Sequence, residues 1–199
     1  MTSNAEREPR FGTESFKGAR AMIRHLKAGA FGAVLLTGGL LAGTAMAGEQ
    51  FVDDTGFAAS GYDVVAYRSL TQAPVGGAQP APVPGKASIT AEYNGATWAF
   101  ASAANRDAFV ANPAKYAPVY DGHCAYGIAQ GGKVPANPHL WRIIDDKLYL
   151  NITRTVVGFW EADIQGNLKQ SEVNWASLEK KNSPDGPVPQ FDASHAPVN

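Results

Sequence analysis

Eight of the 13 prolines of this 199-residue chain lie in two short stretches, residues 71–86 and 180–199, and they limit where regular helices and strands can form. Residues 71–86 hold four prolines, Pro74, Pro80, Pro82 and Pro84. Because proline fixes φ and lacks a backbone N–H, this stretch can be neither a continuous helix nor a central strand. Residues 180–199 hold four more prolines and few apolar residues, which predicts a flexible Pro-rich tail.

The first 47 residues have the layout of an export signal. Six Lys and Arg residues precede or flank an uncharged stretch over 28–43, which is followed by Ala45-Met46-Ala47. A basic region, an apolar region and a small-x-small site predict a signal peptide over 1–47, cleaved after Ala47, and a periplasmic or secreted product. The alternative is an uncleaved anchor, although about 16 residues are short for a span of roughly 20. Contact with a membrane is expected only through this segment, if it stays uncleaved.

The net charge and the numbers of methionine and cysteine residues exclude several classes of function. The signal removes six of the 17 Lys and Arg residues and three of the 18 Asp and Glu residues, so eleven and fifteen remain and residues 48–199 carry a net charge of −4. An acidic domain of this kind is not expected to bind nucleic acid. All three methionines lie in the signal, and the one cysteine, Cys124, excludes a disulfide framework or a Cys-rich zinc module.

Two β-hairpins are predicted. The first pairs residues 88–93 with 96–100 around Asn94-Gly95, because both turn positions tolerate a positive φ. The second lies within residues 140–152, where apolar runs flank Asp145-Asp146.

Helical signals surround these hairpins. Ser102 can cap a helix over 103–111 that Pro113 stops. A second helix begins after Thr153 or Thr155, and Gly166-Asn167 is expected to separate it from a third that runs to Leu178. Hairpins with segregated helices predict an α+β fold: a small single domain over 48–179 with two β-hairpins and three or more short helices.

The order and spacing of four short motifs are characteristic of a known family. They are Gly-Tyr-Asp-Val-Val-Ala-Tyr at 61–67, Tyr-Asn-Gly-Ala-Thr-Trp-Ala-Phe-Ala-Ser at 93–102, Phe-Val-Ala-Asn-Pro-Ala-Lys-Tyr at 109–116 and Gly-His-Cys-Ala-Tyr at 122–126. A Lys-Leu-Tyr-Leu strand follows at 147–150. Together they resemble the YHS-domain family in its longer, exported bacterial form. The resemblance extends over about residues 55–179.

The resemblance implies metal chemistry, but this chain lacks the two cysteines at which the family is proposed to carry it. The short YHS domain is proposed to bind a metal, with copper as a candidate, through two cysteines before a helix. Those positions are Ala101 and Asn105 here, and neither side chain binds a soft metal. The resemblance therefore directs attention to Cys124, where it implies redox or metal chemistry.

Cys124 and two histidines make up the candidate metal set. His123 adjoins the thiol, His139 follows Pro138 near the end of a loop, and together they would form a His₂Cys site suited to copper or zinc. Asp121 and Tyr126 lie close in sequence to this set. Because neighbouring side chains diverge on a helix or strand, joint binding by His123 and Cys124 needs a turn.

Two further candidates lie in the first motif. Asp63 is a possible acid, and Tyr62 belongs to an aromatic-rich set that forms either a core or a stacking pocket for a ligand. No G-x-S-x-G, H-E-x-x-H, P-loop or G-x-G-x-x-G motif occurs, so an enzyme is not favoured.

Three hypotheses remain. The leading one is an exported, non-enzymatic domain that binds copper, or else zinc, with Cys124 at the centre. The second is a thiol redox protein, which needs an external thiol because no second cysteine is present. The third is a module that binds a small ligand or a partner, with Cys124 packed in the core.

Overall fold

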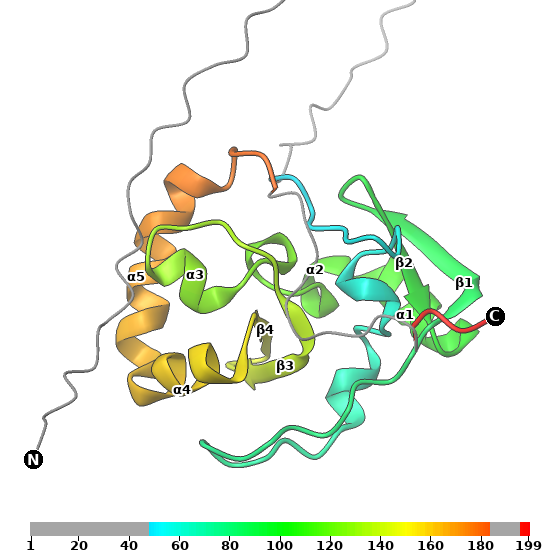
Figure 1. Ribbon diagram of the computed structural model, residues 1–199. Helices are drawn as coiled ribbons and strands as arrows, with labels where there is room; N and C mark the ends of the chain where they lie inside the picture. The colour runs from blue at the N-terminus through cyan, green and yellow to red at the C-terminus, as the bar shows by residue number, and fades with distance from the viewer. Residues whose placement is uncertain (1–47, 184–195) are drawn as a thin grey trace, which may run out of the picture. The chain divides into compact units, whose positions relative to one another are not determined.

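Two antiparallel hairpins and five helices make up the part of the chain that this computed structural model describes, residues 48–183 and 196–199 (Figure 1). The strands are β1 (Lys86–Tyr93), β2 (Ala96–Phe100), β3 (Asn137–Ile144) and β4 (Lys147–Asn151). The helices are α1 (Ala103–Ala111), α2 (Pro113–Tyr116), α3 (Ala125–Ala129), α4 (Arg154–Ala162) and α5 (Ile164–Leu178). Short 3₁₀ turns form at Ala59–Gly61, Ala66–Ser69 and Tyr120–Gly122. The predicted α+β class is confirmed.

Both hairpins turn where the sequence places them. Asn94 and Gly95 have φ of 51° and 74°, and Asp145 and Asp146 have φ of 49° and 58°. These left-handed values suit Gly, Asn and Asp, whose short side chains tolerate that region. Each turn fixes the register beside it, with Tyr93 opposite Ala96 in the first hairpin.

Helix α1 also follows its local chemistry. Ser102 accepts a hydrogen bond from the Asn105 N–H at 3.1 Å, as an N-cap does. The cap brings Phe109 onto the first hairpin, where its ring centroid lies 5.1 Å from that of Trp98. This packing forms one end of a core that extends to Leu148 and Leu150 of β4.

The boundary between α4 and α5 differs from the prediction. Helix α4 begins after the Thr153 cap but ends at Ala162, and Ile164 and Gly166 already belong to α5. The reason is Asp163, whose carboxylate accepts from the Gly166 N–H at 2.9 Å and begins a new helix. Capping by Asp163 therefore outweighs the helix-breaking tendency of Gly166.

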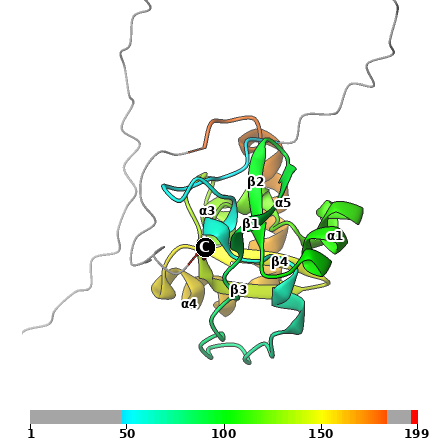
Figure 2. The ribbon, with the colours of Figure 1, turned by 90° about the vertical axis from the view of Figure 1, so that its right-hand side faces the viewer.

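Helix α5 packs along α3 (Figure 2). Between and around these helices lies a second apolar cluster. This cluster contains Tyr120, Ala125, Ile128, Tyr149, Trp160 and Leu178. The Asn174 side-chain amide donates to the Ile128 and Ala129 carbonyls at 2.9 Å each, and the Ser171 hydroxyl donates to the Ala125 carbonyl at 3.1 Å. These bonds satisfy carbonyl groups of α3 and fix it against α5.

The predicted signal, 1–47, and residues 184–195 of the predicted tail lie outside the described residues. The end of the chain, 196–199, joins the first hairpin: Val198 donates to the Gly85 carbonyl at 2.7 Å and accepts from the Ala87 N–H at 2.8 Å. No helix in the described ranges is both long and apolar enough to span a membrane.

Candidate functional site

Cys124 lies between the Tyr120–Gly122 turn and α3, where it caps the helix. Its side chain has no exposed surface. Its Sγ accepts from the Gly127 N–H at 3.4 Å, and the thiol donates to Asn151 Oδ1 at 3.5 Å. A backbone bridge joins Cys124 to Leu150. The only cysteine of the chain is thus enclosed between α3 and β4.

Burial determines the protonation state of this thiol. It raises the pKa of Cys124 from 9.0 to about 11, and the opposing effect of the Gly127 N–H is smaller. A helix N-terminus ordinarily favours the thiolate, but desolvation outweighs that effect here. The nucleophile and the metal ligand are both the thiolate. Near neutral pH, Cys124 is instead a protonated thiol.

His123 is buried as completely as its neighbour, and both of its ring nitrogens are engaged. Nδ1 lies 2.8 Å from the Tyr120 carbonyl, so this nitrogen carries the proton and donates. Nε2 lies 3.0 Å from Ser183 Oγ and accepts from it. Burial lowers the pKa of His123 to about 4. The ring is therefore neutral, and its lone pair is already used.

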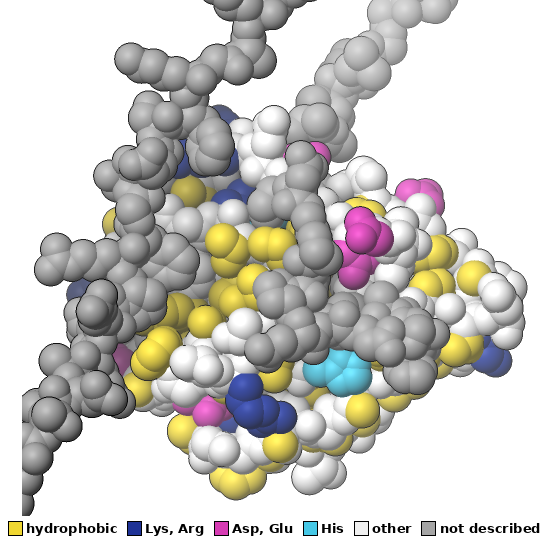
Figure 3. All heavy atoms as spheres, viewed as in Figure 1, with side chains coloured by type: hydrophobic (Ala, Val, Ile, Leu, Met, Phe, Trp, Pro, Cys, Tyr) yellow, Lys and Arg dark blue, Asp and Glu magenta, His cyan; other side chains and the backbone are white. Residues whose placement is uncertain are grey.

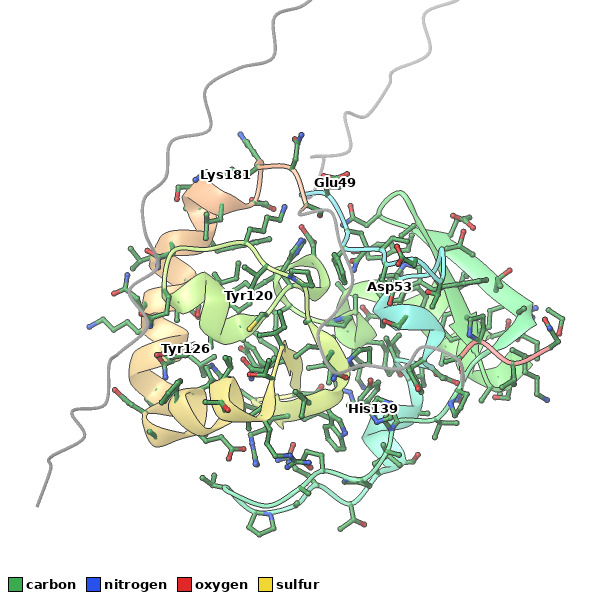
Figure 4. The ribbon with its side chains drawn as sticks, viewed as in Figure 1. Glu49, Asp53, Tyr120, Tyr126, His139 and Lys181 are labelled. Atoms are coloured by element: carbon green, nitrogen blue, oxygen red, sulfur yellow. The ribbon has the colours of Figure 1, made fainter. Side chains whose placement is uncertain are left out.

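His139 belongs to a different group of side chains. It lies in β3, and its Nε2 is 2.9 Å from the hydroxyl of Tyr62, whose ring it meets edge-on at 5.1 Å. Tyr126 contacts Phe159 of α4 instead, with ring centroids 5.9 Å apart. Figure 4 shows His139 and Tyr126 in separate parts of the molecule.

The structure therefore does not gather His123, Cys124 and His139 around one point. Within residues 48–183 and 196–199, no three His, Cys, Asp or Glu side chains lie where they could hold one metal ion. Each of the three predicted ligands has hydrogen-bonding partners of its own.

Asp63, the other acidic candidate, is a fully buried hub of hydrogen bonds. Its Oδ1 accepts from the N–H groups of Val65 and Ala66 at 2.9 and 3.1 Å. Its Oδ2 accepts from the Ala101 N–H at 2.8 Å and from the Asn105 amide at 2.7 Å. Four donors converge on one carboxylate and tie the Ala66–Ser69 turn to the start of α1.

Comparison with known families supplies an independent assignment. The sequence model of the YHS domain matches residues 73–120. Residues 73–120 of this chain form a YHS domain. The match covers the two strands and the two helices from β1 to α2, whereas Cys124 and all later elements lie beyond it. No curated protein and no solved structure matches the chain.

A YHS domain is suggestive of a metal-binding module, and the structure describes the two positions where the resemblance expects cysteines. The Ala101 N–H and the Asn105 side-chain amide both donate to Asp63. By the resemblance, these are the two positions where other YHS domains have cysteines. In this YHS domain, both positions are held by hydrogen bonds to the Asp63 carboxylate.

Asp121 has a backbone φ of 51° and helps to hold the start of the described chain. Its carbonyl accepts from the Phe51 N–H at 2.9 Å and from the Gln50 amide at 2.8 Å. Its Oδ1 accepts from the Asn94 amide at 3.2 Å. Burial raises the pKa of Asp121 to about 6, and Lys133 only partly offsets this rise.

A broad groove of about 490 Å³ lies beside the motifs at 61–67 and 109–116 and was not predicted. Its lining includes Arg68, Leu70, Lys115, Tyr116, Ile143 and Asp146. Arg68 is fixed there by the Asp146 carboxylate at 2.5 Å and by the Lys115 carbonyl at 2.7 Å. No sequence signal marks this groove, because its walls come from three distant parts of the chain.

The buried pair Arg142–Glu161 was also missed. The two side chains are 6% and 5% exposed, and Arg142 Nε donates to Glu161 Oε1 at 2.8 Å. The other carboxylate oxygen accepts from the Gly76 N–H at 2.7 Å, and Arg142 reaches the Ala73 and Pro74 carbonyls. The pair thereby fastens the Pro-rich segment onto β3 and α4. An arginine inside an apolar strand was the one sequence signal.

Proposed function

We propose that this YHS domain is a non-catalytic binding module whose groove takes a small ligand, while Cys124 is part of the core. The complete burial of Cys124 carries the second part of the proposal, and the residues that line the groove support the first. A buried, protonated thiol that donates to Asn151 has the environment of a packing residue. A catalytic or metal-binding thiol instead needs access and an environment that favours the thiolate.

The states of the neighbouring side chains support the same assignment. His123 is neutral, and Tyr120 and Ser183 occupy its two nitrogens, so binding a metal would break an existing hydrogen bond. His139 is engaged with Tyr62. A copper site at Cys124 would therefore require rearrangement of α3 and of the segment that includes Ser183.

The groove offers both apolar and charged contacts to a small ligand. Leu70 and Ile143 give it an apolar part, and Tyr116 adds an aromatic ring. Arg68 is paired with Asp146, so the Lys115 ammonium gives the lining a net positive charge. This combination suits a small amphipathic anion. On the face shown in Figure 3, the visible basic side chains lie in several separate places.

A titration with two probes, followed residue by residue by NMR, tests the proposal. Copper(I), kept reduced, is expected to cause no stoichiometric shift at Cys124 or His123. The amphipathic anion 8-anilinonaphthalene-1-sulfonate is expected to shift Leu70, Tyr116 and Ile143. Lys115→Gln should weaken its binding about fivefold, because one exposed charge contributes up to about 1 kcal/mol.

Lys169→Gln is the matched control, since Lys169 is exposed on α5 and does not line the groove. It should leave the affinity for the anion unchanged. Stoichiometric copper binding that Cys124→Ser abolishes would overturn the proposal and restore the metal site. Binding of the anion with no shift at the groove residues would contradict the proposed location.

A further inference from the structure

Gly48 is buried at a point where no side chain fits. A Cβ on this residue would lie 2.3 Å from the Glu179 carbonyl oxygen and 2.5 Å from Asp121 Oδ2. Real Cβ atoms do not approach backbone so closely, so this position requires glycine. The Gly48 nitrogen is bonded to the same Cα, and ordinary bond lengths therefore place it within about 5 Å of Asp121 Oδ2.

The residues after Gly48 are firmly held. The Asn94 side-chain amide lies 3.1 Å from the Gly48 carbonyl and 3.2 Å from Asp121 Oδ1, and it donates to both. Gln50 and Phe51 both donate to the Asp121 carbonyl. The start of the described chain is thus built into the fold around Asp121, and Glu49 is seen at the same end of the molecule as Lys181 (Figure 4).

These hydrogen bonds use only one of the two carboxylate oxygens of Asp121. Its Oδ2 is buried and accepts no hydrogen bond from any described residue. The charges that act on this region are the carboxylates of Glu49 and Glu179 and the ammonium of Lys133, while His123 is neutral. Together with Asp121, three negative groups face one positive group. Lys133 is the one cation among these groups, and it offsets only part of the effect of burial on Asp121.

We propose that cleavage after Ala47 supplies a second cation. Hydrolysis of the Ala47–Gly48 peptide bond consumes one water and leaves a carboxylate on Ala47 and an ammonium on Gly48. The new ammonium pairs with Asp121 Oδ2, so removal of the predicted signal completes an ion pair in the folded domain. Before cleavage, Gly48 offers only an uncharged amide at this place.

The experiment uses the full chain with residues 42–47 replaced by the recognition sequence of a protease that leaves Gly48 as the first residue. Stability is measured by urea denaturation at pH 7 before and after cleavage of the folded protein. Cleavage should raise the folding equilibrium constant about tenfold. The Gly48 amine should titrate about one unit above its ordinary pKa of about 7.7–8.0, since one unit corresponds to tenfold.

The sign of the pH dependence follows from the two partners. A raised amine pKa stabilises the fold below about pH 8, and this gain is lost as pH rises through the folded pKa. Protonation of Asp121, whose pKa is about 6 before cleavage, removes the gain on the acid side. The difference between cleaved and uncleaved chains should therefore be largest between about pH 6 and 8.

Asp121→Asn in the same chain is the control, and cleavage should not stabilise it. Equal stabilisation of the wild type and Asp121→Asn would overturn the proposal, as would an amine that titrates at its ordinary pKa in the wild type. The amine pKa is measured without any substitution at Asp121. It decides the question even if Asp121→Asn does not fold.

Discussion

Replacing Asp63 with alanine is expected to lower the free energy of unfolding by about 4 kcal/mol or more. The substitution removes the side-chain acceptor of four N–H donors, those of Val65, Ala66, Ala101 and Asn105. Of these, only Ala66 keeps another acceptor in the described part of the chain, the Asp63 carbonyl at 3.1 Å. A buried donor without a partner costs about 1–3 kcal/mol, so even partial rescue by water leaves a large loss. Urea denaturation followed by circular dichroism measures the effect.

Asp107→Ala is the matched control, because Asp107 is exposed and its ion pair is with its chain neighbour Arg106. It should change stability by less than about 0.5 kcal/mol. Asp63→Asn, which keeps the shape but turns an N–H toward other donors, should fall between the two. Equal stability of the Asp63→Ala and Asp107→Ala variants would show that the hub is not needed for the fold.

Glu161→Gln is expected to lower the free energy of unfolding by about 3 kcal/mol. Arg142 would be left buried without its counter-charge, and breaking a buried pair from one side costs about 3–5 kcal/mol. The double variant Arg142→Met/Glu161→Leu should recover much of the loss, because it leaves no buried charge. A double-mutant cycle under urea denaturation measures both effects.

Asp146→Asn provides the comparison for a more exposed pair. Asp146 is 68% exposed where it meets Arg68, and asparagine tolerates its positive φ, so the loss should stay below about 1 kcal/mol. If Glu161→Gln were no more destabilising than Asp146→Asn, the Arg142 pair would not fasten the Pro-rich segment as described.

Local chemistry made much of the fold predictable. The Asn94-Gly95 and Asp145-Asp146 turns and the Ser102 and Thr153 caps each act within a few residues, so the sequence shows them directly. The start of α5 is the exception, and it also has a local cause. The prediction placed the break at Gly166, but Asp163 caps the helix three residues earlier.

The candidate site depended on contacts that the sequence does not show. The motif identified Cys124 and His123 as unusual, but their burial arises where α3, β4 and the segment near Ser183 meet. The sequence indicated that Asp63 is a possible acid, but it did not predict that four N–H groups donate to its carboxylate. Two of these donors lie about 40 residues further along the chain.

The central claim, that Cys124 is a core residue and not a reactive or metal-binding thiol, is tested most directly by its rate of alkylation in the folded protein. At pH 8, a thiol with a pKa of about 11 is about 0.1% ionised, against about a quarter for an ordinary thiol of pKa 8.5. Iodoacetamide should therefore modify the folded wild type at least about 100-fold more slowly than the protein in urea at the same pH. Labelling of the folded protein within a few-fold of the unfolded rate, with an apparent pKa below about 8.5, would contradict the account.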